Sequence, residues 1–304
     1  IATAGLAHAA QSEHQPESPA DAPEFAQAEV ISNVAGDASD ADDDGSRRRF
    51  GSIYELNAWF TYYYQNPEPE LIPAYIRSTV EEGVVGNPVG LAMCASFLRE
   101  VVQDHPEMID VWYAEFADAS ETERWLLWNA IWWSGVEESK PFFERIRDSV
   151  SERDRTEAID PFIATDPTEL RDEVIENDVV MRCMVEAFHA SGDLAYADRI
   201  IQEIDAPPLD VLNPVVRQGG FMMPAERVFR AAQSQLERLA HRHSVVHQHV
   251  KDSLNSLTPE GRAYVEQVLT RVDERLAIEP TPDPAAGGPG LHAERLNKAL
   301  PADR

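Results

Sequence analysis

The chain has 304 residues and a formal charge of −28, with 54 acidic and 26 basic residues. Such an acidic surface repels the phosphates of nucleic acids and of anionic membranes, so we expect neither as a partner. Basic proteins and divalent metals remain compatible with it. A chain of this length can bury enough apolar surface to fold without disulfides or metal.

Residues 1–51 are predicted to contain a signal-peptide remnant followed by a disordered acidic segment. Ala7 and Ala9 fit the small-x-small pattern that precedes a signal-peptidase cleavage site, which indicates export to the periplasm or beyond. The alternative is an Ala-rich disordered start. Asp40 to Gly45 match the first half of a calcium-binding loop, but Gly51 stands where that loop needs a bidentate Glu. We therefore interpret this stretch as a disordered acidic run.

Residues 52–277 are predicted to form one all-α domain, because apolar residues recur there at helical spacing. No alternating strand pattern of convincing length occurs. Residues 278–304 are predicted to be a Pro/Gly linker and a short amphipathic helix over Leu291–Leu300. The expected helices cover 53–65, 73–82, 88–103, 106–117, 121–134, 139–150, 167–191, 194–205, 225–243, 245–256 and 259–276.

Capping residues mark several of these helix starts. Asn87 and Thr258 each precede a Pro, which suits the first helical position. Ser120 with Glu123, and the segment 166–169, have capping-box spacing. A Gly after a helical run marks three predicted helix ends, at Gly83, Gly135 and Gly192. The fold class is therefore an irregular multi-helical array, either α-solenoid-like or an orthogonal helical domain.

The predicted helix 121–134 is apolar on nearly all sides. It carries four Trp residues with Leu and Ile between them. A helix of this kind belongs in the middle of a core and is too short to cross a bilayer. An aromatic platform for sugar binding is the alternative. No run of 18 apolar residues occurs, so no membrane span is expected.

One predicted hairpin resembles a tetratricopeptide repeat. The resemblance covers residues 181–208 and is carried by the spacing of Phe188, Gly192, Ala197, Ile201 and Pro208. It implies two antiparallel helices, with a small residue of the second packed against the first. The usual apolar-Gly pair of the first helix is absent. The chain as a whole is similar to exported helical proteins of proteobacteria, and this similarity implies no known activity.

The two cysteines, Cys94 and Cys183, lie within apolar helical runs. We interpret them as buried thiols that pack as small hydrophobic side chains. A disulfide after export is the alternative, but two cysteines in the middle of helices rarely have the required geometry.

The histidines His241, His243, His247 and His249 are the best candidates for chemistry. On a continuous helix His243 and His247 share one face, so the spacing predicts a metal site for Zn²⁺, Ni²⁺ or Cu²⁺. A third ligand would have to come from His249, Glu237 or another helix. In the competing interpretations His243 packs in an apolar seam, or Ser244 caps a new helix.

Three functions stay open at this level. The first is a non-enzymatic protein-interaction or scaffold module of the cell envelope, favoured by helical hairpins without catalytic motifs. The second is an envelope enzyme whose acidic or His site is assembled from distant residues. The third is a divalent metal binder through His243 and His247. No nucleophile elbow, phosphate loop or cofactor motif occurs, so no cofactor is predicted.

Overall fold

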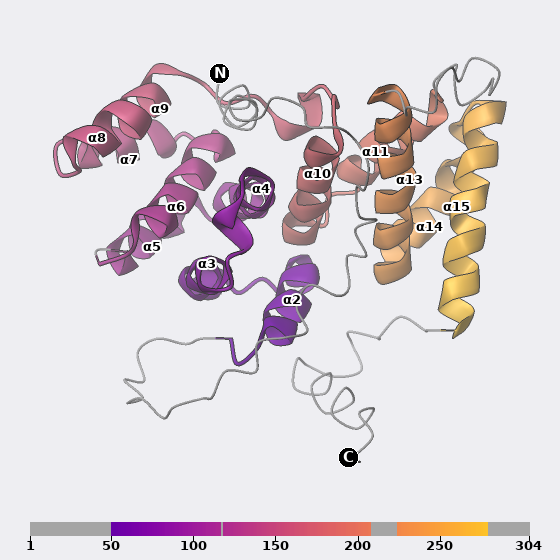
Figure 1. Cartoon of the computed structure of the whole chain (residues 1–304), viewed down its shortest axis with the longest axis horizontal. Helices are drawn as coiled ribbons and strands as arrows, with labels where there is room; N and C mark the ends of the chain where they lie inside the picture. Colours follow the sequence, from indigo (N-terminus) through magenta and orange to yellow (C-terminus); the bar gives the residue numbers. More distant parts are fainter. Residues whose placement is uncertain (1–49, 117, 208–223, 279–304) are drawn as a thin grey trace, which may run out of the picture. The chain divides into compact units, whose positions relative to one another are not determined.

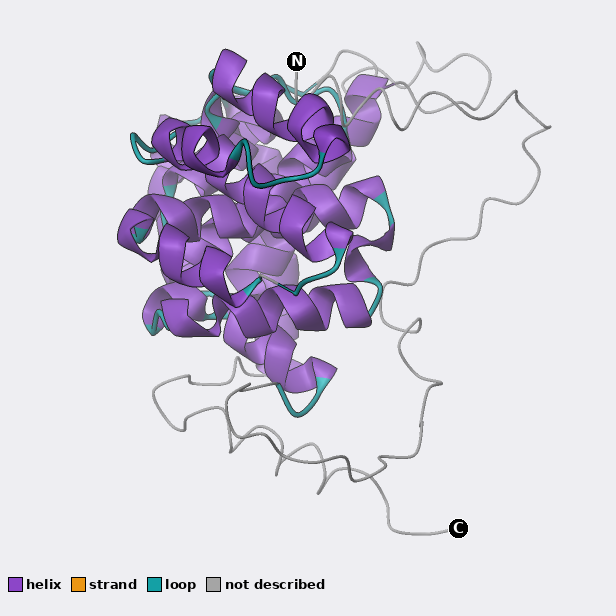
Figure 2. Cartoon of the chain, turned by 90° about the vertical axis from the view of Figure 1, so that its left-hand side faces the viewer, coloured by secondary structure: helices purple, strands orange, loops and turns teal. Residues whose placement is uncertain are grey.

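A computed structural model describes residues 50–116, 118–207 and 224–278, all within one structural unit, Arg49–Arg304. Its regular elements are helices, which confirms the predicted all-α, multi-helical fold, and the described residues contain no strand (Figure 1, Figure 2). The predicted cleavage site, the acidic run 40–45, the linker beyond Ile278 and the helix at Leu291–Leu300 lie outside the described residues.

The helices follow one another along the chain with short connections. The first group is α2 (Ile53–Thr61), α3 (Ile72–Glu81), α4 (Pro88–Asp104), α5 (Ile109–Glu115), α6 (Glu121–Ser134), α7 (Ser139–Ile146), α8 (Glu152–Asp154) and α9 (Asp160–Ala164). The second group is α10 (Asp178–Ser191), α11 (Ala195–Asp205), α13 (Pro224–Arg242), α14 (Ser244–Ser253) and α15 (Pro259–Ile278). Short 3-10 turns between the helices include η1 (Tyr63–Gln65), η4 (Pro106–Met108) and η6 (Leu170–Asp172).

Most helix starts and stops follow the predicted local chemistry. The Asn87 side chain accepts a hydrogen bond from the Gly90 amide at 2.9 Å and so caps α4. Ser120 and Glu123 form a complete capping box at the start of α6. The helix then ends at Gly135 in the left-handed conformation, with φ 67°. These bonds are local, which is why sequence spacing was enough to find them.

The prediction of a continuous helix over 167–191 is wrong in its first half. Only the short turn η6 forms there, and Asn177 caps a separate helix, α10, by accepting from the amides of Val179 and Val180. Glu169, expected in a capping box, has an extended backbone, and its side chain pairs with the buried guanidinium of Arg99. Glu169 therefore takes part in an ion pair with a residue distant in sequence and does not form the predicted capping box.

The segment 151–165, expected to be a loop or a short helix, is helical over most of its length. Ser151 caps α8 by accepting from the amide of Asp154 at 3.0 Å. A π-helical turn over Arg155–Ile159 then joins α8 directly to α9. The two short helices therefore form one continuous helical stretch, which packs against α7.

The core is centred on α4 and α10, which make the most extensive contact between any two described elements (Figure 1). On its other side α4 packs against α6, whose residues Leu126, Leu127, Trp128 and Ile131 are at most 1% exposed. The predicted core position of this Trp-rich helix is confirmed. None of the helices in the described part of the chain is both long and apolar enough to cross a lipid bilayer.

The two cysteines face this core. Cys94 on α4 and Cys183 on α10 are free and buried, in agreement with their interpretation as packed thiols. Burial raises the pKa of each thiol to about 12, so neither is a thiolate at neutral pH.

The helices α10 and α11 form a hairpin around Gly192, and Ala197 of α11 is fully buried. Gly192 has φ 68°, and a Cβ atom added there would lie 2.5 Å from Cδ2 of Tyr64. The turn therefore needs glycine both for its backbone and for the close approach of η1. The resemblance of this hairpin to a tetratricopeptide unit stays a prediction.

Candidate functional site

His243 lies at the break between two helices. Helix α13 ends at Arg242 and α14 begins at Ser244, with His243 as the N-cap residue in an extended conformation. The imidazoles of His243 and His247 therefore do not share the face of one continuous helix. This arrangement corresponds to the competing interpretation in which a new helix starts near Ser244.

The His243 ring is packed among other rings and is 1% exposed. Its neighbours lie at centroid distances between 5.1 and 5.6 Å and are Tyr62, Tyr64, Phe188 and His189. Nδ1 of His243 is 3.2 Å from the hydroxyl of Tyr64. Burial lowers the pKa of His243 to about 2, and His189 and the nearby arginines act in the same direction. The ring is therefore neutral at physiological pH.

The other histidines of the cluster contact different helices. Nε2 of His247 is 3.0 Å from Oδ1 of Asp273 on α15. Nε2 of His249 is 2.6 Å from Oδ1 of Asp198 on α11. A third candidate ligand, Glu237, accepts from Nε of Arg271 at 2.7 Å.

Within the described ranges, no group of three or more His, Cys, Asp or Glu side chains could hold a metal ion. Nδ1 of His243 is taken by Tyr64, while its Nε2 is buried without a hydrogen-bond partner, and Nε2 of His247 faces Asp273. Metal binding by this pair stays a prediction.

A buried His–carboxylate pair on α10 was missed from the sequence. Oε2 of Glu186 is 2.9 Å from Nδ1 of His189, and their side chains are 4% and 2% exposed. Burial lowers the pKa of His189, and the adjacent Glu186 only partly offsets this effect. The guanidinium of Arg238 on α13 lies 3.7 Å from Glu186. The i,i+3 spacing of Glu186 and His189 was the available signal.

We call Tyr64, Glu186, His189, Arg238 and His243 the polar hub. They connect η1, α10 and α13 at the α13–α14 break. None of these five residues lines any of the hollows described below. Glu186, His189 and His243 are buried and Tyr64 and Arg238 are half-buried, so the hub has the character of a joint between helices.

A second buried network joins α4 to α6 and α11. The guanidinium of Arg99 is 1% exposed; its Nε donates to the carbonyl oxygen of Trp133 at 3.1 Å, and Nη1 lies 3.2 Å from Oε1 of Glu100. The Tyr196 hydroxyl donates to the same carboxylate at 2.7 Å. Burial raises the pKa of Glu100, although Arg99 opposes the shift. This network pairs three polar side chains inside the core.

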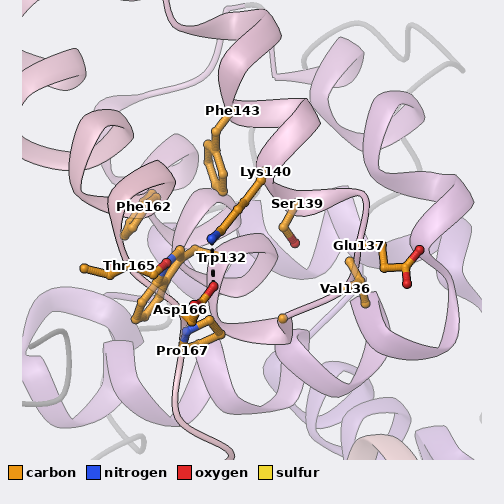
Figure 3. Close-up of a pocket in the computed structure, with 11 residues that line it drawn as sticks. Trp132, Val136, Glu137, Ser139, Lys140, Phe143, Phe162, Thr165, Asp166 and Pro167 are labelled. Carbon is orange, nitrogen blue, oxygen red and sulfur yellow. Dashed lines mark hydrogen bonds and ion pairs between the residues drawn. The ribbon is translucent and has the colours of Figure 1, made fainter.

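Two surface hollows lie on either side of α7. The first, which we call the aromatic hollow, has a volume of about 220 Å³ (Figure 3). Its floor consists of Trp132 of α6, Phe143 of α7 and Phe162 of α9. Trp132 stacks on Phe162 with ring centroids 5.3 Å apart. The rings come from three helices that pack together around this point.

An ion pair crosses the aromatic hollow. Nζ of Lys140 lies 2.7 Å from Oδ1 of Asp166, as the dashed line in Figure 3 shows. Both side chains are largely exposed, at 48% and 84%. The indole N–H of Trp132 donates to the carbonyl oxygen of Thr165 at 3.3 Å, which fixes the ring against the segment after α9.

The second hollow, the acidic hollow, lies between η4, α5 and α7 and has a volume of about 330 Å³. Its apolar lining is Pro106, Ile109, Pro141 and Phe142, and its charged lining is Glu107, Asp110, Glu137, Glu138 and Arg145. Glu137 also lines the aromatic hollow, so the turn between α6 and α7 separates the two. We call the two hollows together the α7 surface.

A third hollow, of about 380 Å³, lies between α11 and the start of α13. Phe229 and Val228 form part of its wall.

A comparison with protein families, with curated proteins and with solved structures finds no match to this chain. The candidate site therefore rests on the geometry of the α7 surface and of the polar hub alone.

Proposed function

We propose that this chain is a non-enzymatic protein-interaction module that binds its partner through the α7 surface. The observation that carries the proposal is the pair of hollows beside α7, each with an apolar floor and an exposed charged rim. Interfaces use small apolar pockets for anchoring side chains, surrounded by polar groups that remain in water.

The size of the aromatic hollow supports a protein partner over a small molecule. Small-molecule sites usually enclose about 300–1,000 Å³. The aromatic hollow, at about 220 Å³, is below this range, and the acidic hollow, at about 330 Å³, is at its lower end. Volumes of this size accommodate one or two side chains each.

The position of the ionisable groups also supports a non-enzymatic role. The His189–Glu186 pair and both cysteines are buried, and none of them lines a described hollow. A general acid or a nucleophile has to reach its substrate.

The proposed setting is the cell envelope, on the evidence of the cleavage pattern at Ala7 and Ala9. N-terminal sequencing of the protein recovered from an envelope fraction tests this part of the proposal. A mature chain that begins at Ala10 would support export, and an uncleaved chain in the cytoplasmic fraction would contradict it.

Site-specific photo-crosslinking tests the interaction itself. A photo-crosslinking amino acid at Lys140 or Glu138 should capture one discrete partner in cells, because both residues are exposed on the α7 surface. The matched control is the same amino acid at Glu274, which is exposed on α15. Equal capture from all three positions, or none from α7, would contradict the proposal.

A further inference from the structure

We propose that the α7 surface binds a cationic segment of a partner protein, in which Arg or Lys residues flank an apolar side chain. This inference rests on the proposed function and adds the chemistry of the partner. Four carboxylates line the acidic hollow, and Arg145 is the only cation that lines it among the described residues. Electrostatic complementarity of this kind selects partners and accelerates their association.

The local charge excess is not compensated within the described residues. Arg145 pairs with Asp110, whereas Glu137 and Glu138 have no basic partner in that part of the chain. The N-terminus of α7 contributes roughly half a positive charge, which does not offset the remaining carboxylates. The formal charge of −28 adds a long-range attraction for cations.

The rim carboxylates are available at little energetic cost. Glu137 and Glu138 are exposed, and the side chain of Glu107, which lies 3.4 Å from Nδ1 of His105, is 68% exposed. These carboxylates are already in water and need no rearrangement of the core. Below them Phe142 and Ile109, at 1% and 3% exposed, form a fixed apolar floor. The hollow thus offers charges for a cation and a rigid contact for an apolar group.

The chain's own cations show how such a segment would bind. The guanidinium of Arg145 lies over the ring of Phe142, 5.6 Å from its centroid, while it pairs with Asp110. In the aromatic hollow the ammonium of Lys140 pairs with Asp166. Each hollow therefore already holds one cation against a carboxylate, and an arginine of a partner would make the same contacts with the carboxylates that remain.

The test uses the full chain and a fluorescent synthetic peptide in which three arginines alternate with leucines. Two comparison peptides replace either the arginines by Glu or the leucines by Gly. The first protein variant combines Glu137→Lys with Glu138→Lys. The matched control combines Glu260→Lys with Glu274→Lys on α15, which changes the formal charge by the same amount at exposed positions.

The expected result is binding of the Arg/Leu peptide that weakens about tenfold in the α7 variant at low ionic strength and stays unchanged in the α15 control. The Glu peptide should not bind, and the Gly peptide should bind more weakly. Equal weakening in both variants would show that binding depends only on the overall charge of the chain, and this would overturn the proposal. Absence of binding by the Arg/Leu peptide would also overturn it.

Crosslinking from position 138 separates this inference from the proposed function. A captured partner without a cationic segment would still support the proposed function, but it would overturn the inference about the chemistry of the partner. A crosslink to residues of the same chain, or to a second copy of it, would assign the surface to another occupant and likewise overturn it. No captured partner would count against the proposed function itself.

Discussion

The polar hub and the α7 surface both contain charged and aromatic side chains. The ionisable groups are mostly buried in the hub and mostly exposed at α7. In the hub the imidazole of His243 is 1% exposed and neutral, held against Tyr64. At α7 the carboxylates of Glu137 and Glu138 stand at the surface, and charged side chains surround an apolar floor. Burial therefore suits the hub residues to stability and leaves the α7 residues free for binding.

This difference matters because the residue types alone suggest the reverse. Histidines are common in catalytic and metal-binding sites, whereas exposed acidic residues are expected all over the surface of a highly acidic protein. Yet the histidines of the cluster contact separate helices, whereas Glu137 and Glu138 of the α6–α7 turn lie together at the acidic hollow.

Removing Glu186 should have the largest effect, because its carboxylate is buried beside His189 and Arg238. We expect Glu186→Ala to lower the free energy of unfolding by about 3–5 kcal/mol, since it leaves a buried cation without its partner. Urea unfolding followed by circular dichroism measures this. The control Glu157→Ala, at an exposed pair with Arg153, should cost no more than about 1 kcal/mol. Equal losses would contradict the structural role of the hub.

Replacing Gly192 tests the close approach of η1 to the α10–α11 turn. Gly192→Ala adds a Cβ atom 2.5 Å from Tyr64 in a left-handed conformation, so we expect a loss of about 2–3 kcal/mol in stability. Gly83 has nearly the same φ, 69°, but a Cβ atom added there would meet nothing within 4 Å, so Gly83→Ala should cost only about 1–2 kcal/mol. Thermal unfolding of both variants gives the difference, and a Gly192→Ala loss no larger than the control would contradict the packing argument.

The hub should make stability depend on pH. Burial lowers the pKa of His243 from 6.5 to about 2, so below pH 6.5 the unfolded chain binds a proton that the folded chain does not. Stability is therefore highest above pH 6.5 and falls as the pH decreases, by about 2 kcal/mol per such imidazole between pH 7 and pH 5.

His243→Gln should remove about that much of the decrease. The remaining slope comes from His189 and His247, whose pKa values burial lowers in the same direction, while Glu100 and Asp104, whose pKa values burial raises, act in the opposite one. Urea unfolding at pH 7, 6 and 5 measures the slopes. Identical slopes in the two proteins would show that His243 is not buried in its neutral form.

The smallest effect on stability is expected on the α7 surface. Lys140→Gln breaks an exposed ion pair with Asp166 and should change the free energy of unfolding by less than about 1 kcal/mol. If cationic segments bind there, the released carboxylate should tighten binding of the Arg/Leu peptide by about two- to threefold. Fluorescence titration measures this, and weaker binding would contradict the proposed contacts.

Local signals in the sequence predicted much of the fold. The Asn87 cap, the Ser120–Glu123 box and the left-handed Gly135 each depend on residues within one helical turn, so their spacing is sufficient. The burial of the Trp-rich helix α6 also followed from its composition. The failure at 167–191 has the opposite cause, because Glu169 binds Arg99, which lies 70 residues away in the chain.

The sequence predicted the candidate site less well than it predicted the fold. The spacing of His243 and His247 suggested a shared face, but the break at Ser244 turns the two rings toward different partners. Conversely, the acidic hollow combines Glu107 with Glu138, which are not neighbours in sequence. No periodic pattern links these residues, since only the packing of α5 beside α7 brings them together.

The sequence alone was enough to predict the helical class, most helix boundaries and the acidic character of the surface. These properties arise from hydrogen bonds within one turn, from the period of apolar residues and from composition. Which ionisable groups are buried in the hub and which are exposed at α7 could be learned from the folded arrangement alone. That distinction depends on contacts between distant helices, and it is the distinction that sets the charge state and the availability of each group.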